Sequence, residues 1–359
     1  MRHRILLSLL GLGLFFTACD SGDSTETNSG QNAAKASYFD MASPARGSVY
    51  SLGDTVLLKL SAKPNAPEVD SVEVLIDGQK VATFTGTEYA WPTEGATVGR
   101  KIIRLMVYGG SEPETVRTST TLHSNLVPEV WGYRVINRYP HDRQAFTQGL
   151  EYYQGYLYEG TGQKGASSLR KVDILTGSVV QQHDLAPEYF GEGITRVGDE
   201  LVQITWQSRT GWVYDLATFS EKRSFNYPTE GWGIAHNGEH IVMSDGTNRL
   251  YLMNPEDFTQ QGQLEVYDHE GPVKELNELE IINGEVYANI WTTDRIARID
   301  LATGRVLSYI EMTGLLPQRT GQEDVLNGIA HDAATGRTWV TGKYWPNLFE
   351  VAFVPTSAQ

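Results

Sequence analysis

One motif occurs five times in the C-terminal part of the chain, and this repeat constrains the fold more than any other feature. Each copy reads as a strand, a glycine-containing turn and a second strand. The copies are QGLEYYQGYLYEGTG from 148, EGITRVGDELVQITW from 192, WGIAHNGEHIVMSDG from 232, NELEIINGEVYANIW from 277 and NGIAHDAATGRTWVTG from 327. They begin 40 to 50 residues apart, which is the length of a four-stranded propeller blade. A sandwich or barrel would also alternate polar and apolar residues, but would not repeat in this way. The sequence therefore predicts a five-bladed β-propeller.

The two ends of the repeat region are predicted to complete one blade together. A third strand follows every copy, and four copies run into a fourth strand, such as RVLSYIEM from 305. The fifth copy lacks a fourth strand because the chain ends. We expect WGYRVINRY at 131–139 to supply it by pairing with 348–354, which closes the ring.

Equivalent positions of the copies converge on the central channel of a propeller, and here they carry polar and aromatic side chains. The opening positions are Gln148, Glu192, Trp232, Asn277 and Asn327. The second strands end at Gly162, Trp206, Gly246, Trp291 and Gly342-Lys343. Taken singly, a glutamate is more often a surface group, a tryptophan a core residue and a lysine a rim charge. Their convergence favours a site for a small polar substrate with an apolar stem.

Residues 37–126 have a different pattern, with short alternating runs at 55–60 and 72–76. The second run meets Asp77-Gly78, a hairpin turn signal, and resumes at 80–82. Further strands are expected at 101–108 and 115–122. About six short strands in this length predict a small immunoglobulin-like β-sandwich that serves as a spacer or docking module.

The first 36 residues read as a targeting segment and a tether. Arg2 and Arg4 precede an apolar run at 5–16, and small residues lead into Cys19, the only cysteine. The run is short for a membrane span and resembles a bacterial lipoprotein signal over 1–18, with Cys19 as the lipidated residue. An ordinary cleaved signal is the alternative. Residues 19–36 lack large apolar side chains and are expected to be a disordered tether, with the propeller domain over 127–359. This predicts an envelope lipoprotein facing the periplasm or the exterior, held to the membrane only by its lipid.

Composition and failed motifs exclude several function classes. Acidic residues outnumber basic ones 44 to 29, for a net charge of −15, which disfavours nucleic acid as a partner and favours solubility. GTGQKG at 160–165 matches a dinucleotide pattern but lies between two strands. His236 and His240 are separated by the Asn237-Gly238 turn, so a histidine metal site is only a minor alternative.

Nine short motifs resemble, in order, the plant and bacterial glutaminyl cyclases. They are AFTQGL at 145–150, YFGEGIT at 189–195, QITW at 203–206, EGWGI at 230–234, SDGT at 244–247, LNELE at 276–280, ANIW at 288–291, VLNGIA at 325–330 and TGKYWP at 341–346. The resemblance spans about 133–354, and GTGQKG differs from a more usual serine-containing version. It implies a five-bladed propeller that uses no cofactor and no catalytic metal, and we expect the chain to be a monomer. The implied substrates are peptides or proteins with N-terminal glutamine, which are cyclised to pyroglutamate with release of ammonia.

The resemblance also implies roles for eight residues. Glu192 corresponds to the proton-transfer residue, and Asn277 and Lys343 to groups that steady the γ-amide oxygen. The substrate pocket corresponds to Phe146, Gln148, Trp206, Trp232 and Trp291. Burial among indoles would raise the pKa of Glu192, as proton transfer requires, while Lys343 would oppose this.

Two other functions remain open from the sequence. Five-bladed propellers also host glycosidases, which need two opposed carboxylates, and Asp245 is the best second carboxylate beside Glu192. A non-catalytic binding module of the envelope is the other alternative, because fold does not fix function.

Overall fold

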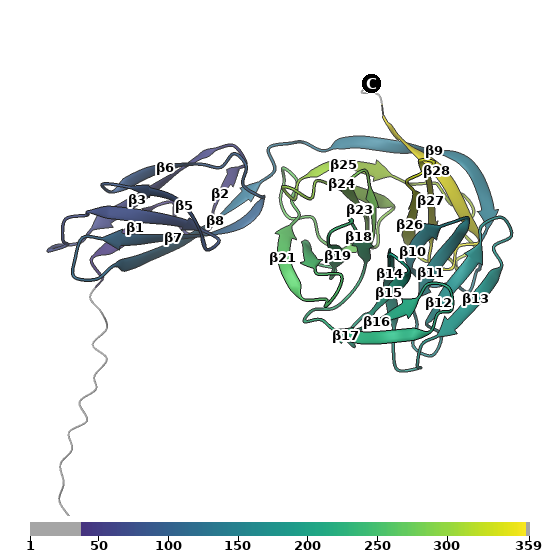
Figure 1. Cartoon of the computed structure of the whole chain (residues 1–359). Coiled ribbons are helices and arrows are strands. Elements are labelled where there is room, and N and C mark those ends of the chain that lie inside the picture. Colours follow the sequence, from purple (N-terminus) through teal and green to yellow (C-terminus); the bar gives the residue numbers. More distant parts are fainter. Residues whose placement is uncertain (1–36, 357–359) are drawn as a thin grey trace, which may run out of the picture. The chain divides into compact units, whose positions relative to one another are not determined.

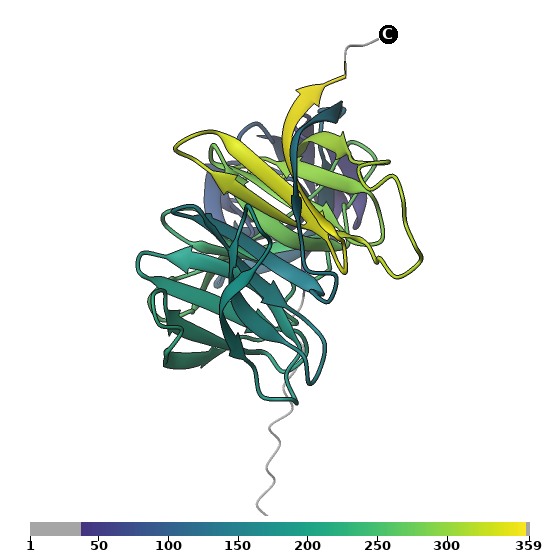
Figure 2. The same cartoon turned by 90° about the vertical axis from the view of Figure 1, so that its right-hand side faces the viewer.

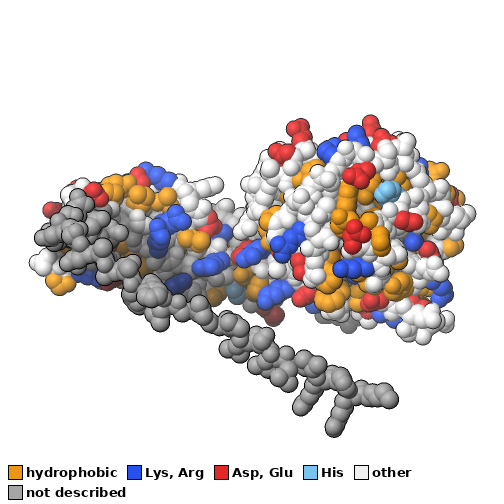
Figure 3. Space-filling view, turned by 90° about the horizontal axis from the view of Figure 1, so that it is seen from below, with side chains coloured by type: hydrophobic (Ala, Val, Ile, Leu, Met, Phe, Trp, Pro, Cys, Tyr) orange, Lys and Arg blue, Asp and Glu red, His pale blue; other side chains and the backbone are white. Residues whose placement is uncertain are grey.

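The computed structural model describes residues 37–356, and every regular element among them is a β-strand (Figure 1). The signal peptide, Cys19 and the whole of the tether predicted from the sequence lie outside the described residues. No helix in the described range could cross a membrane by its length and apolar character. On the face in Figure 3, acidic and basic side chains of the described residues are interspersed.

The N-terminal region is a two-sheet sandwich, as predicted. One sheet has the order β1 (Phe39–Ser43), β3 (Thr55–Ala62), β6 (Glu88–Pro92). The other has the order β2 (Ser48–Ser51), β8 (Glu114–His123), β7 (Gly99–Tyr108), β4 (Ser71–Ile76), β5 (Gln79–Phe84). Alternate residues of β3, such as Val56 and Leu58, are buried, because successive side chains point to opposite faces of a strand. Asp77 and Gly78 both have positive φ, which is the hairpin turn that their sequence predicts.

Five four-stranded blades follow, in the order expected from the repeat (Figure 1). The first two are β10 (Thr147–Tyr153), β11 (Tyr156–Thr161), β12 (Ser168–Asp173), β13 (Val179–Asp184) and β14 (Gly191–Val197), β15 (Glu200–Thr205), β16 (Thr210–Asp215), β17 (Glu221–Asn226). The next two are β18 (Ile234–His236), β19 (Ile241–Ser244), β20 (Arg249–Met253), β21 (Gln260–Glu265) and β22 (Leu276–Ile282), β23 (Glu285–Ile290), β24 (Arg295–Ile299), β25 (Val306–Glu311). The last has β26 (Leu326–Asp332), β27 (Arg337–Gly342), β28 (Asn347–Pro355) and β9 (Glu129–Pro140). The innermost strands β10, β14, β18, β22 and β26 contact one another in a closed cycle, which defines the channel.

The ring is closed by the two ends of the repeat region, which confirms the sequence prediction. Strand β9 is antiparallel to β28, with Gly132 opposite Val354 and Tyr139 opposite Leu348. Figure 2 shows β28 in yellow beside β9 in blue. The beginning of β9 also pairs in parallel with β25, with Glu129 opposite Ser308, so one strand joins the fourth and fifth blades. The repeat does not encode this second pairing, because β9 lies outside it.

Candidate active site

A pocket of about 270 Å³ lies where the innermost strands begin. Its lining includes all eight residues that the sequence and the resemblance single out. They are Phe146, Gln148, Glu192, Trp206, Trp232, Asn277, Trp291 and Lys343. The other four lining residues are Phe190, Thr292, Asp324 and Val325. The repeat therefore brings residues from all five blades to one place.

The position just after the second strand of a blade carries either tryptophan or glycine in four of the five blades. Strands β15 and β23 end just before Trp206 and Trp291, whereas the first and third blades carry glycine at that position. A Cβ atom on Gly162 would lie 2.4 Å from the Phe190 ring, and one on Gly246 would lie 2.5 Å from the Trp232 ring. These glycines leave the space that the neighbouring aromatic rings occupy, so the aromatic wall is packed around them.

Glu192 is a buried carboxyl group on β14, with 4% of its surface exposed. Burial raises the pKa of Glu192 well above its ordinary value. The ammonium of Lys343 opposes this shift, and the charge of Glu230 adds to it. The group therefore has the proton affinity of a general base that works nearer to neutral pH than a solvated glutamate does.

Lys343 and Asn277 complete the polar side of the pocket. Lys343 follows β27, is 4% exposed, and places its Nζ 4.7 Å from the centre of the Phe146 ring. Burial lowers the pKa of Lys343, against the raising effects of Glu192 and Asp324. The side-chain oxygen of Asn277 is buried and has no hydrogen-bond partner within residues 37–356. A buried amide group without a partner is costly unless a ligand supplies one.

Asn327, the fifth opening residue, lies beside the pocket and does not line it. Its side-chain amide donates to the Thr147 carbonyl oxygen at 3.0 Å and to Oε1 of Gln148 at 3.3 Å. It thereby holds Gln148, which is 4% exposed, in place.

A layer of glycines lies directly beneath the pocket. The residue after each opening position is glycine in the first, second, third and fifth blades. In the fourth blade it is Glu278. A Cβ atom on Gly233 would lie 2.1 Å from the Asn277 carbonyl oxygen, so the inner strands approach too closely for side chains. Glu278 crosses this layer and accepts hydrogen bonds from the backbone N–H groups of Leu150 (3.2 Å) and Ile329 (2.9 Å). Neither Glu278 nor any of the four glycines of this layer lines the pocket.

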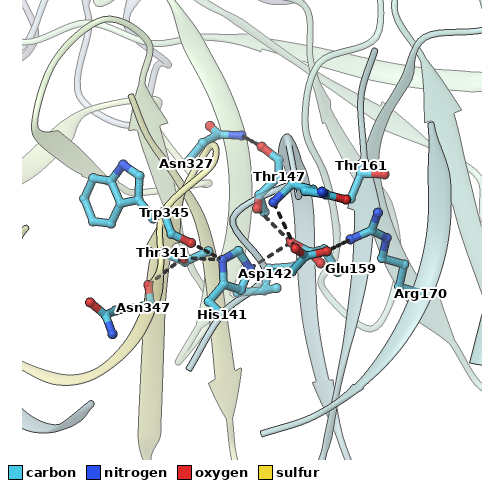
Figure 4. A network of polar contacts seen from close by, with 12 residues as sticks. His141, Asp142, Thr147, Glu159, Thr161, Arg170, Asn327, Thr341, Trp345 and Asn347 are labelled. Carbon is cyan, nitrogen blue, oxygen red and sulfur yellow. Dashed lines mark hydrogen bonds and ion pairs between the residues drawn. The ribbon is translucent and has the colours of Figure 1, made fainter. Parts of the chain in front are cut away.

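Buried polar contacts join the first and last blades next to the pocket (Figure 4). His141 bonds to the Trp345 carbonyl oxygen at 2.8 Å and to the carboxylate of Glu159 at 3.0 Å. Thr147 donates to the same carboxylate at 2.7 Å. Burial lowers the pKa of His141, but Glu159, the Trp345 carbonyl group and Asp142 together outweigh it, so this pKa is raised. These contacts fix both the start of β10 and the segment after Lys343.

Four lining residues were not predicted, and a sequence signal exists for only some of them. Phe190 precedes Glu192 by two positions, as Phe146 precedes Gln148, so the repeat itself could have identified it. Thr292 follows Trp291, while Asp324 and Val325 belong to the segment between β25 and β26. No repeat covers that segment.

Asp245 and His240, which belong to the alternative interpretations, have other partners among residues 37–356. Asp245 accepts hydrogen bonds from Tyr251 at 2.8 Å and from the Thr247 backbone, and it does not line the pocket. His240 bonds to Gln261 at 2.9 Å. Among residues 37–356 there is no group of three or more histidine, cysteine or acidic side chains suited to a metal ion.

The fold and the pocket define an all-β protein of the propeller class with one polar, indole-lined site at the channel mouth. Residues 109–353 match the model of the family described as glutamine cyclotransferase, and residues 39–104 match a bacterial Ig domain. The chain belongs to the glutamine cyclotransferase family. It is 42% identical over 231 residues to the glutaminyl-peptide cyclotransferase of Arabidopsis thaliana, covering 63% of this chain and 72% of that protein. The crystal structure of Myxococcus xanthus glutaminyl cyclase matches with a TM-score of 0.61 and 35% identity, covering 64% of this chain and all of that one.

Proposed function

We propose that this chain is a glutaminyl-peptide cyclotransferase that converts the N-terminal glutamine of peptides or proteins to pyroglutamate and releases ammonia. The observation that carries the proposal is the pocket itself. It joins a buried carboxyl group, an ammonium and an amide with unused hydrogen-bonding capacity inside an aromatic wall. Its volume of about 270 Å³ is just below the range of about 300–1,000 Å³ typical of small-molecule pockets, which suits a single residue.

The reaction requires little beyond orientation and proton transfer. The α-amine of the substrate attacks the carbon of its own γ-carboxamide, a C–N bond forms, and the bond to the amide nitrogen breaks. The nucleophile is tethered to its target, so the pocket wall contributes mainly by holding the side chain in its curled form. The proton lost by the amine is the one that the departing nitrogen needs to leave as ammonia.

We assign that proton transfer to Glu192. An α-amine has an ordinary pKa of about 7.7–8.0, so a base with a raised pKa is better matched to it than a solvated carboxylate. In this proposal the side-chain N–H groups of Asn277 and the ammonium of Lys343 stabilise the negative charge that develops on the carbonyl oxygen.

Ammonia release from a short peptide beginning with glutamine tests the proposal. The matched controls are the same peptide beginning with asparagine, whose shorter side chain cannot close a five-membered ring, and the N-acetylated glutamine peptide, which lacks the nucleophilic amine. Release from the glutamine peptide alone supports the function. No release from it, with folded protein, would exclude the function.

We also propose that the chain acts as a monomer anchored in the bacterial envelope through Cys19. The basic start, the apolar run and the small residues before Cys19 support the anchor. Metabolic labelling with a fatty acid and membrane fractionation of the wild type and Cys19→Ala test it. Equal labelling of both would refute it.

A further inference from the structure

The aromatic wall of the pocket consists of two groups of rings that the ring contacts do not join. In one group, Phe146 packs edge-on against Phe190 at 5.9 Å, and Phe190 packs edge-on against Trp206 at 5.7 Å. In the other group, Trp232 packs edge-on against Trp291 at 5.5 Å. No ring contact therefore joins Trp206 of the second blade to Trp232 of the third blade.

The carboxylate of Glu230 forms this junction. Its Oε2 accepts the indole N–H of Trp206 at 2.8 Å and the indole N–H of Trp232 at 3.3 Å. Its Oε1 accepts a hydrogen bond from the side chain of Gln207 at 3.2 Å. Burial raises the pKa of Glu230, but the hydrogen bonds from Trp232, Trp206 and Gln207 and the charge of Arg209 together outweigh it, so the net pKa is lowered. Glu230 is therefore a carboxylate at neutral pH.

The same charge acts on the buried carboxyl group of the pocket. Glu192 is influenced by Lys343, which favours its ionised form, and by Glu230, which opposes it. Tyr227 lies near Glu192, Asp324 near Lys343, and Arg209 near Glu230. Of these groups, Glu230 both affects the pKa of Glu192 and accepts hydrogen bonds from the indoles of the pocket wall.

We infer that Glu230 is a positioning residue of this active site, which fixes the indoles of Trp206 and Trp232 in the pocket wall and sets the electrostatic surroundings of Glu192. The inference rests on the proposed cyclase function for its kinetic consequences. Its structural part, the two hydrogen bonds that the Glu230 carboxylate accepts from the indoles, does not depend on that function.

Two substitutions separate the two roles. Glu230→Gln keeps a side-chain oxygen for the indoles and removes the charge, so the ascending limb of the pH profile of kcat/KM should move to lower pH. The sign follows because the negative charge raises the pKa of Glu192, whose base form is the active one. Glu230→Ala removes the acceptor as well. It should give the same pH shift and raise KM about tenfold to a hundredfold, the value of one hydrogen bond to a charged acceptor.

The matched control is Glu239→Gln, the same charge change at a side chain that is 82% exposed and outside the pocket. It should leave KM and the pH profile unchanged. A residue that only braced the structure would change stability alone. The positioning role is overturned if Glu230→Gln and Glu230→Ala both keep the wild-type KM and the wild-type pH profile of kcat/KM.

Near-ultraviolet circular dichroism of the indoles separates this result from failure of the proposed function. If the wild type releases no ammonia, the function fails, and the spectrum still tests the contact. A weakened indole signal in Glu230→Ala, with Glu239→Gln unchanged, supports the contact. An unchanged spectrum refutes it.

Discussion

Glu192 and Glu278 lie one layer apart in the same channel, and burial raises the pKa of both. They differ in what their oxygens face. Glu278 is bonded to two backbone N–H groups from other blades, whereas Glu192 lines a pocket that also holds Lys343. A raised pKa alone therefore does not mark a catalytic carboxyl group. Access to a substrate-sized space distinguishes the two, and the following predictions test that difference.

The largest expected effect is that of Glu192→Gln. The amide keeps the shape of the side chain but cannot transfer a proton at neutral pH. General acid–base help is worth about 10²–10⁴-fold, so kcat should fall by that factor while KM changes little. The melting temperature should be kept, and it is measured on the same preparation as the rate. Near-native turnover by the folded variant would refute the role of Glu192.

Lys343→Met should lower kcat by about 10²–10³-fold, the usual loss of one group that stabilises an oxyanion. Because Lys343 lowers the pKa of Glu192, its removal should also move the ascending pH limb to higher pH. This is opposite to the shift expected for Glu230→Gln, and the two profiles are measured with one substrate. Shifts of the same sign would contradict the electrostatic description of the pocket.

Glu278→Gln should change stability and not turnover. The amide offers one acceptor where two backbone N–H groups now bond, and an unsatisfied buried group costs about 1–3 kcal/mol of unfolding free energy. Urea denaturation measures this loss, and kcat per folded molecule should be kept. A folded variant with a large loss of kcat would place Glu278 in the chemistry and remove the contrast with Glu192.

The smallest effect is expected on the far side of Glu278, at Glu151. Burial raises the pKa of Glu151 from 4.5 to about 7, against the opposing effect of Arg196. The folded state then binds a proton more tightly than the unfolded state, so this stability is present below pH 4.5 and is lost as pH rises towards 7. Glu151→Gln should show a shallower decline of unfolding free energy over this range. The unfolding free energy is measured by urea denaturation at several pH values. If it declines equally steeply with pH in both proteins, the assignment is refuted.

The sequence was sufficient for the features that the repeat encodes. The period predicted five blades, and the missing fourth strand predicted the pairing of β9 with β28. Equivalent positions also placed Gln148, Glu192 and Asn277 at one mouth of the channel. The catalytic roles assigned to Glu192 and Asn277 came from the resemblance to the glutaminyl cyclases.

Features that depend on packing between blades could not be predicted in this way. Glu278 stands where the other blades have glycine. The close approach of the inner strands at this layer is visible only in the structure. Likewise, the contact of Glu230 with two indoles joins residues of adjacent blades. The parallel pairing of β9 with β25 arises because β9 extends beyond the strand it completes.

If the layer that holds Glu278 closes the pocket at its inner end, it also determines which part of a polypeptide can enter. A chain that passes through a site needs an entrance and an exit, whereas a cavity closed at its inner end can be entered only by a chain terminus. The enzyme would then distinguish a terminal from an internal glutamine by shape, before any amine is recognised. Since the same opening serves both directions, ammonia and the cyclised end must leave along the path by which the next substrate arrives.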